Sequence, residues 1–224
     1  MQFYTDQLFH IYNQGNNRQT IFFTNENYDY FLWKLQAYFL PFGDIIAYCL
    51  MPNHFHLLFF VTRVEVERKI LWTNIDKIES LRRTMKYAND AKEVNASYSR
   101  IADKNSIVTL NDSIGICQKS YTRAINQEKN WTGSLFRKEC KAKDGWIDEF
   151  ITLIKENGKM DYRFSIGNDF AYSCFEYIHN NPKEAGLVSR NTDWNYSSAK
   201  DYEGLRKESI CNIELGRKIL GIRE

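Results

Sequence analysis

The chain of 224 residues has little of what marks several large protein classes. It contains only 11 Gly and 3 Pro and no low-complexity tract, and 43% of its residues are hydrophobic, which excludes collagen and extensive disorder. Its 30 Lys and Arg nearly balance 28 Asp and Glu, so the formal charge of +2 neither supports nor excludes a nucleic-acid partner, because a basic surface can be local. These figures predict one globular domain, or one domain with an appendage.

The cysteines and the apolar runs also argue against a disulfide-rich or zinc-knuckle protein and against a membrane-spanning protein. The five cysteines are odd in number, widely spaced and never in a C-x-x-C pair, which argues against a disulfide framework and a thiolate zinc knuckle. The first residues show no basic segment followed by an apolar one, and no run approaches the roughly 18 apolar residues of a membrane span. We therefore expect a soluble protein of the reducing cytoplasm, with no membrane partner.

The pattern of apolar residues predicts an α+β chain. Runs of β-forming residues predict strands at residues 8–12, 45–51, 54–61 and 135–143, with Pro52 and Asn53 at the turn of a hairpin. Helical spacing predicts helices at residues 27–40, 76–89, 112–127, 146–154 and 170–180, with a modest one near 215–220. Asp112 is expected to cap the third helix. The order of these elements favours a largely antiparallel sheet covered by helices.

Histidine is scarce, and two of the four form His54-Phe55-His56 on a predicted strand. Side chains on a strand repeat every second residue, so both imidazoles project from one face, about 7 Å apart. Two neutral imidazoles can share a divalent cation if a third ligand approaches from a facing element. The alternative is two satisfied polar side chains, although burying two unpartnered imidazoles would be costly. Leu58 and Phe59 exclude a metallo-β-lactamase-like clamp, and Leu58 also excludes a histidine triad.

A second group of polar residues lies at the end of the last long predicted helix, in residues 177–182 (YIHNNP). Tyr177 and Asn181 are i and i+4 on this helix, so a phenol and an amide can face the same site. His179 projects elsewhere and is expected to be structural. A packed core tyrosine and an ordinary helix stop remain the alternatives for Tyr177 and for Asn-Asn-Pro.

The runs at residues 51–58 (MPNHFHLL) and 177–188 (YIHNNPKEAGLV) resemble the signature blocks of single-tyrosine HUH transposases, in particular REP-associated tyrosine transposases. Lesser blocks agree in order, at residues 10–19 (HIYNQGNNRQ), 120–126 (SYTRAIN), 133–138 (GSLFRK) and 194–198 (WNYSS). The resemblance implies a transposase domain at residues 1–202, with insertions near 94–107 and 144–169, followed by a C-terminal extension at 203–224.

The resemblance also implies a fold, an activity and roles for residues. It implies a ferredoxin-like antiparallel sheet covered by helices, with the two histidines on a central strand. His54 and His56 match the metal ligands, Asn181 matches the polar position that completes the metal site, and Tyr177 matches the nucleophile. The implied activity is cleavage and rejoining of hairpin-containing single-stranded DNA through a 5′-phosphotyrosine, with Mg²⁺ or Mn²⁺, in a monomer or a homodimer. Gln14 and Lys183-Glu184 depart from the Arg and Val-Arg more usual in the family.

Basic residues are candidate contacts for the DNA backbone, with a solvated face as an equal alternative. They are Arg18, Arg137, Lys138, Lys141, Lys143 and Lys183, with Arg82, Arg83 and Lys86 on a predicted helix. Trp131 is a candidate for stacking on an unpaired base. No phosphate-binding G-x-x-x-x-G-K-[ST] loop is present, in agreement with a reaction that needs no ATP.

Two other functions stay open at this point. One is a catalytically silent protein that binds DNA hairpins and retains the fold. The other is a rolling-circle-type replication initiator, but such proteins usually add a helicase, for which 224 residues leave no room.

Overall fold

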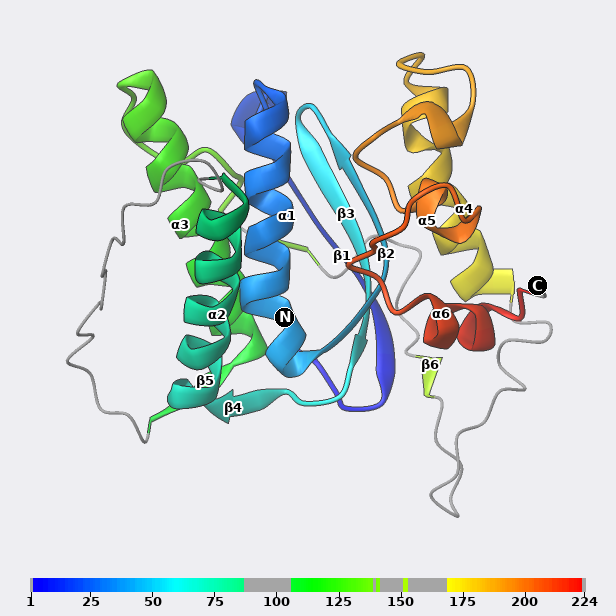
Figure 1. Cartoon of the computed structure of the whole chain (residues 1–224), viewed down its shortest axis with the longest axis horizontal. Coiled ribbons are helices and arrows are strands. Elements are labelled where there is room, and N and C mark those ends of the chain that lie inside the picture. Colours follow the sequence, from blue (N-terminus) through cyan, green and yellow to red (C-terminus); the bar gives the residue numbers. More distant parts are fainter. Residues whose placement is uncertain (1, 87–105, 139, 142–150, 153–168, 223–224) are drawn as a thin grey trace.

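The protein is described here from a computed structural model. The structure describes residues 2–86, 106–138, 140–141, 151–152 and 169–222 (Figure 1). The predicted insertion near 94–107 lies outside these residues except for 106–107, and so does most of the one near 144–169. No helix in the described residues is long and apolar enough to cross a membrane.

A four-stranded antiparallel sheet organises the chain. Its strands are β1 (Gln7–Gln14), β2 (Gly43–Met51), β3 (His54–Val61) and β6 (Ile151–Thr152), in the order β2-β3-β1-β6. Because β1 and β2 both run antiparallel to β3, they are parallel to each other, and α1 (Asn25–Phe39) connects them. This is the split βαβ unit of a ferredoxin-like sheet. The predicted α+β class is confirmed, and the two histidines of the H-x-H motif lie on the strand between β1 and β2.

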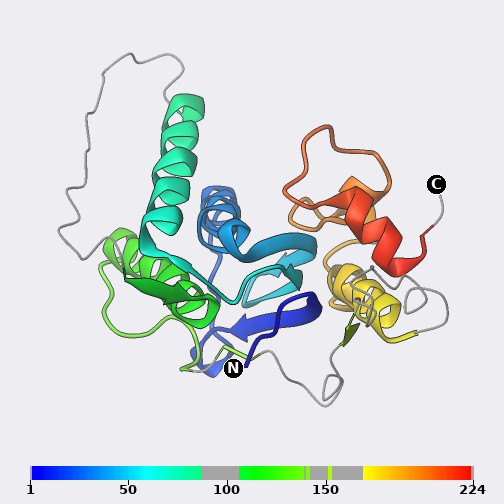
Figure 2. The ribbon, with the colours of Figure 1, turned by 90° about the horizontal axis from the view of Figure 1, so that it is seen from below.

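Helices cover both faces of the sheet (Figures 1 and 2). On one face lie α1, α2 (Arg68–Lys86) and α3 (Leu110–Lys129). On the other face lie α4 (Asp169–Glu184), α5 (Ala199–Tyr202) and α6 (Ile213–Leu220).

Shorter elements connect these layers. They are the 3₁₀ helices η1 (Asn16–Arg18), η2 (Leu40–Phe42) and η4 (Asn191–Asp193), and a two-stranded sheet of β4 (Glu65–Glu67) and β5 (Ile107–Thr109) beside α2 and α3.

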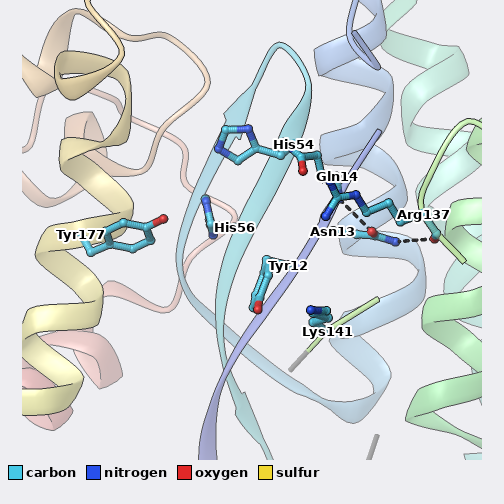
Figure 3. A pocket seen from close by; sticks show the side chains of 8 residues that line it. All are labelled: Tyr12, Asn13, Gln14, His54, His56, Arg137, Lys141 and Tyr177. Carbon is cyan, nitrogen blue, oxygen red and sulfur yellow. Dashed lines mark hydrogen bonds between the residues drawn. The ribbon is translucent and has the colours of Figure 1, made fainter. Parts of the chain in front are cut away.

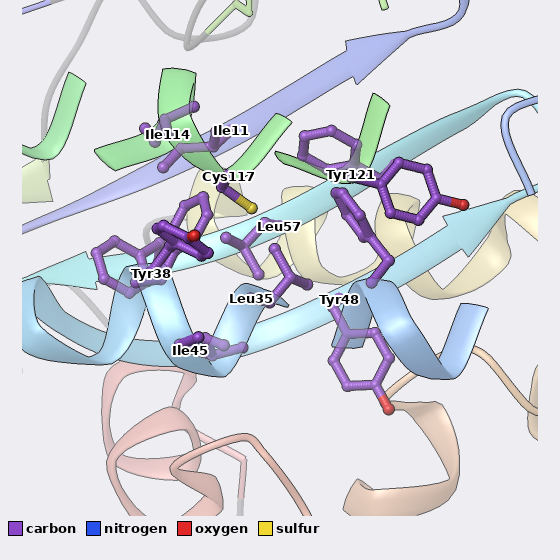
Figure 4. Close-up of a cluster of buried hydrophobic side chains, with 14 of the residues drawn as sticks. Ile11, Leu35, Tyr38, Ile45, Tyr48, Leu57, Ile114, Cys117 and Tyr121 are labelled. Atoms are coloured by element: carbon purple, nitrogen blue, oxygen red, sulfur yellow. The ribbon is translucent and has the colours of Figure 1, made fainter. Parts of the chain in front are cut away.

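The alternation of side chains along β3 divides the core in two. Phe55, Leu57 and Phe59 enter the larger core under α1 and α3, where Figure 4 shows Leu57 close to Leu35 and Cys117. Leu58 and Phe60 enter a smaller core under α4 and α6. Since the period of a strand is two residues, His54 and His56 must lie on the same face as Leu58 and Phe60. The fold therefore directs both imidazoles toward α4.

The chain after α4 packs along the outer edge of β2. Leu50 donates its N–H to Tyr196 O, and Asn212 donates its N–H to Ile45 O. The Arg206 guanidinium donates to Tyr48 Oη at 2.6 Å and forms an ion pair of 2.7 Å with the buried Asp201 carboxylate. Residues 203–222, expected from sequence to be an extension, thus cover an edge strand and contribute Ile219 and Leu220 to the smaller core.

Several helices are longer than their patterns predict. The second helix begins at Arg68, eight residues before its predicted start at 76, and α4 continues through Pro182 to Glu184. The predicted cap of α3 was wrong. Thr109, not Asp112, is the N-cap, and Asp112 at N3 accepts from Thr109 N while Thr109 Oγ1 accepts from Asp112 N. A capping box satisfies two orphan N–H groups at once, and so favours the earlier start.

The strand predicted at residues 135–143 was also wrong for the described part of that range. The segment pairs with β1 only through isolated bridges, Gly15 with Phe136 and Tyr12 with Lys141. Between them the carbonyl of Arg137 accepts from the side chain of Asn13, which replaces a backbone bond of a regular ladder.

The helix predicted at residues 146–154 was wrong at the two positions that the structure describes. Residues 151–152 form β6, which pairs with Gln7 and Leu8, and the rest of that helix lies outside the described residues. Ile and Thr are β-branched, and they meet an edge of β1 that has backbone groups to pair.

Two glycines in helices give a matched test of how closely α6 packs. An Ala side chain at Gly115 in α3 meets nothing, whereas one at Gly216 in α6 overlaps Tyr202 Oη, which donates to Ile46 O. We expect Gly115→Ala to raise the free energy of unfolding by about 0.5–1 kcal/mol through helix propensity. Gly216→Ala should lower it by about 1–3 kcal/mol through overpacking. Urea unfolding measures both, and an equal gain in the two variants would contradict this packing of α6.

Candidate active site

A pocket opens between the β1–β3 pair and α4. It has a volume of about 270 Å³. Figure 3 shows its lining side chains, which are Tyr12, Asn13, Gln14, His54, His56, Arg137, Lys141 and Tyr177. The two histidines and the tyrosine of the sequence motifs, which are far apart in the chain, therefore meet in one place.

Each of the two motif histidines is held at Nδ1. Asn53 donates its side-chain amide to Arg18 O, so its Oδ1 is left to accept from His54 Nδ1 at 2.6 Å. His56 Nδ1 lies 2.8 Å from His10 Nε2. A neutral imidazole that donates from Nδ1 keeps a lone pair at Nε2. The turn residue Asn53 thereby directs the lone pair of His54 away from the turn.

The Nε2 atom of His56 is buried and has no hydrogen-bond partner in the described residues. Burial lowers the pKa of His56 well below its usual range, and the neighbouring His10 and His54 lower it further. Burial also lowers the pKa of His54, against a hydrogen bond with the Asn181 side chain that raises it. Both rings are therefore neutral at physiological pH, which is the form that binds a metal.

Tyr177 extends from α4 into the pocket with its hydroxyl directed toward the histidines (Figure 3). Its ring centroid lies 5.3 Å from that of His56 and 6.1 Å from that of His10, in edge-to-face arrangements. The side chain is 37% exposed. It is thus not the packed core aromatic that was its alternative, and a substrate can reach it.

Asn181 lies one helical turn after Tyr177. Its amide nitrogen donates to Tyr177 O at 2.8 Å, and its side chain also lies beside His54. Two imidazole nitrogens and one amide oxygen are a donor set that suits a divalent cation, and the unpartnered Nε2 of His56 fits a ligand role. No group of three His, Cys, Asp or Glu side chains able to hold a metal occurs among the described residues.

His179 anchors the helix that carries Tyr177. It points away from the pocket, is buried, and its Nε2 lies 2.7 Å from Ser198 Oγ. Ser198 in turn accepts from Tyr48 N at 2.9 Å, which connects α4 to β2 through one side chain. The expectation of a structural role for His179 agrees with this arrangement.

The candidate basic residues fall into groups. Arg137 and Lys141 line the pocket, and Arg18, Lys138 and Lys183 are exposed. Arg82, on the opposite face of the sheet, is bonded to Glu79 and lies over the Tyr30 ring. Arg83 is on the same helix as Arg82, Lys143 lies outside the described residues, and the Lys86 side chain is not described.

Sequence reasoning missed the contribution of β1 to the site. His10, Tyr12 and Gln14 alternate along this strand and lie on the same face as the H-x-H pair. The signal was present in the alternation of β1, but its use needed the register in which Gln14 lies opposite His54 and Tyr12 opposite His56.

Comparisons with known proteins add one structural relative. No protein-family model matches the chain, and no curated protein sequence matches it. Among solved structures, the chain is similar to a REP-associated tyrosine transposase bound to a REP hairpin, with a TM-score of 0.44 and 14% identity. The alignment covers 94% of this chain and 88% of that one.

The anchoring histidine predicts a pH dependence of stability. Burial lowers the pKa of His179 from 6.5 to about 3, so between these values the unfolded chain binds a proton that the folded chain does not. Stability should therefore fall as the pH falls through this window and be insensitive to this group above it. From pH 6.5 to pH 5 the loss from one such group is about 1.5 kcal/mol.

The variant His179→Gln should flatten this slope by that amount, because His54 and His56 remain in both proteins. Urea unfolding at pH 7.5, 6.5 and 5 measures the difference. Parallel stability curves for the two proteins would show that His179 titrates normally in the folded state.

Proposed function

We propose that this protein is a single-tyrosine HUH enzyme of the REP-associated tyrosine transposase type. In this proposal it cleaves and rejoins single-stranded DNA that contains a hairpin, through a covalent 5′-phosphotyrosine. The observation that carries the proposal is the convergence of the Tyr177 hydroxyl and the buried, unpartnered Nε2 of His56 in one basic pocket. The choice of a hairpin substrate comes from the resemblance of the sequence blocks.

The cation would be held by His54, His56 and Asn181. When bound, Mg²⁺ or Mn²⁺ would supply positive charge that stabilises the scissile phosphate and favours loss of the proton from the attacking hydroxyl. Two nitrogen ligands favour Mn²⁺ over Mg²⁺, which prefers an all-oxygen shell.

Tyr177 acts as the nucleophile in this proposal. Its Oη attacks phosphorus in line and forms a bond to the 5′-phosphate, while the bond to the 3′-oxygen breaks and that oxygen leaves as a hydroxyl. A phenol has an ordinary pKa of about 10, so its proton must be lost as the bond forms. Partial exposure of Tyr177 lets the proton pass to solvent. The ester energy is retained, and a second 3′-hydroxyl can reverse the step and join two strands.

The basic side chains of the pocket orient the DNA backbone. Arg137 and Lys141 lie on the β1 side of the pocket, across from Tyr177. A DNA strand that passes between these two basic side chains and Tyr177 would place a phosphate over the histidines. One copy of the chain supplies Tyr177 and both imidazoles, and we therefore propose a site that works within one subunit.

A hairpin-binding protein without activity is the second candidate. It rests on the departures from the family pattern at Gln14 and Lys183-Glu184, which leave open how DNA is held and whether activity is retained. The two candidates differ in whether a covalent protein–DNA product forms.

The nucleophile can be tested with three matched Tyr→Phe variants. A labelled stem-loop oligonucleotide with a single-stranded flank is incubated with the protein and either Mg²⁺ or Mn²⁺, and the covalent adduct is measured on a denaturing gel and by mass spectrometry. Tyr177→Phe should abolish the adduct, because no other group replaces the attacking oxygen. Tyr172→Phe, on the exposed side of the same helix, and Tyr12→Phe, at the pocket wall, should retain it.

Two outcomes would contradict the assignment. An adduct lost only in Tyr12→Phe would transfer the nucleophile to β1. Tight binding of the stem-loop with no adduct under either metal would favour the silent hairpin-binding protein.

The role of the basic wall predicts a change in salt dependence. A side chain that neutralises one phosphate of a single strand contributes a slope of about 0.7 to the logarithmic dependence of affinity on salt. Arg137→Gln should therefore weaken binding and reduce the slope by about 0.7, whereas Arg83→Gln, on the opposite face of the sheet, should change neither. Fluorescence anisotropy at several salt concentrations measures both, and equal effects of the two substitutions would rule out a specific DNA path along the pocket.

A further inference from the structure

We propose that His10 is a positioning residue that fixes the tautomer of His56 and so keeps the Nε2 lone pair of His56 available to the cation. The inference rests on the proposed function, because it assigns a role within the proposed metal site. It concerns a residue outside the motifs that define that site.

The fold brings the two rings together through strand pairing. The first strand pairs antiparallel with β3, with His10 opposite Leu58 and Tyr12 opposite His56, so His10 is a diagonal neighbour of His56 on the same face. The ring centroids are 4.9 Å apart, and His10 Nε2 lies 2.8 Å from His56 Nδ1. Both residues are buried, with 6% of His10 and 5% of His56 exposed. Water therefore has little access to this contact.

The contact between His10 Nε2 and His56 Nδ1 allows only two arrangements of protons on the two rings. Two ring nitrogens at hydrogen-bond distance share one proton, because two lone pairs or two N–H groups would repel. In the first arrangement His56 donates from Nδ1 and His10 accepts at Nε2, which leaves a lone pair on His56 Nε2. In the second, His10 donates, and the proton of neutral His56 must lie on Nε2, where it has no acceptor among the described residues. Only the first arrangement presents a ligand to a cation.

His54 is held at Nδ1 in the same way, by the side-chain amide of Asn53 in place of an imidazole. The Oδ1 of Asn53 accepts from His54 Nδ1, because the amide nitrogen of Asn53 is already used by Arg18 O. Both candidate ligands are thus held at Nδ1 by a neutral group, and both direct Nε2 away from it. Partners of this kind orient ligating histidines and raise their basicity.

The geometry argues against His10 as a ligand itself. Its Nε2 is directed at Nδ1 of His56, and a cation on Nε2 of His56 lies on the other side of that ring. His10 also does not line the pocket, whereas His54 and His56 do. Its action on the cation therefore passes through His56.

The tautomer can be read directly in the metal-free protein. Long-range ¹H–¹⁵N correlation spectra distinguish a protonated imidazole nitrogen from one with a lone pair. We expect His56 to be protonated at Nδ1 and unprotonated at Nε2 in the wild type. In His10→Leu we expect a mixed population or the reverse tautomer, while His54, held by Asn53, should remain unchanged. A wild-type His56 protonated at Nε2 would overturn the inference whether or not the protein binds a metal.

Cation affinity gives a second readout, measured by the electron paramagnetic resonance of Mn²⁺. We expect His10→Leu to weaken Mn²⁺ binding about 10- to 100-fold. His10→Gln, whose amide oxygen can accept from His56 Nδ1, should retain most of the affinity. Thermal unfolding of the metal-free variants verifies that both fold.

The two proposals fail in different ways. Wild-type protein that binds no Mn²⁺ would overturn the metal site and with it the proposed function. Wild-type protein that binds Mn²⁺ with an affinity unaffected by His10→Leu would overturn only the role of His10.

Discussion

The structure depends on a single face of the sheet that is apolar at one end and polar at the other. Leu58 and Phe60 on β3 pack under α4 and α6, and two residues earlier the same face carries His56 and then His54. The apolar end packs α4 against the sheet. The polar end places the histidines beside Tyr177 of the same helix. Burial of the smaller core therefore also places Tyr177 beside the histidines, since α4 carries both the apolar contacts and Tyr177.

Burial governs the electrostatics of this site as well. It lowers the pKa values of His54 and His56, so the rings are neutral without any help from an acidic partner. A neutral imidazole has one donor and one acceptor, and the fold uses the donor of each ring on a neighbour, Asn53 or His10. The remaining buried acceptor of His56 is costly unless a ligand compensates it. The unpartnered Nε2 of His56 therefore supports the proposal that the pocket binds a cation.

The sequence predicted those parts of the site that are encoded by short spacing. His54 and His56 share a face because a strand repeats every two residues, and Tyr177 and Asn181 share a face because a helix repeats every 3.6. The elements that carry them were also predictable from apolar patterns. What the sequence could not supply was the register between strands far apart in the chain. His10 was visible as a histidine on a predicted strand, but only its diagonal position beside His56 gives it a role. The capping box at Thr109 and the bridges of residues 136–141 to β1 were missed for related reasons, since each depends on a specific hydrogen bond rather than on a periodic pattern.

In the proposed function, the sheet and α4 together form a cation site beneath a nucleophilic tyrosine. The most direct measurement is a crystal structure of the protein soaked in Mn²⁺, with the cation located from its anomalous scattering. We expect a peak bonded to Nε2 of both His54 and His56 and to the side-chain oxygen of Asn181, with the hydroxyl of Tyr177 facing it. A cation bound elsewhere would contradict the proposed site. So would a fully occupied Mn²⁺ site with Tyr177 turned away from these histidines.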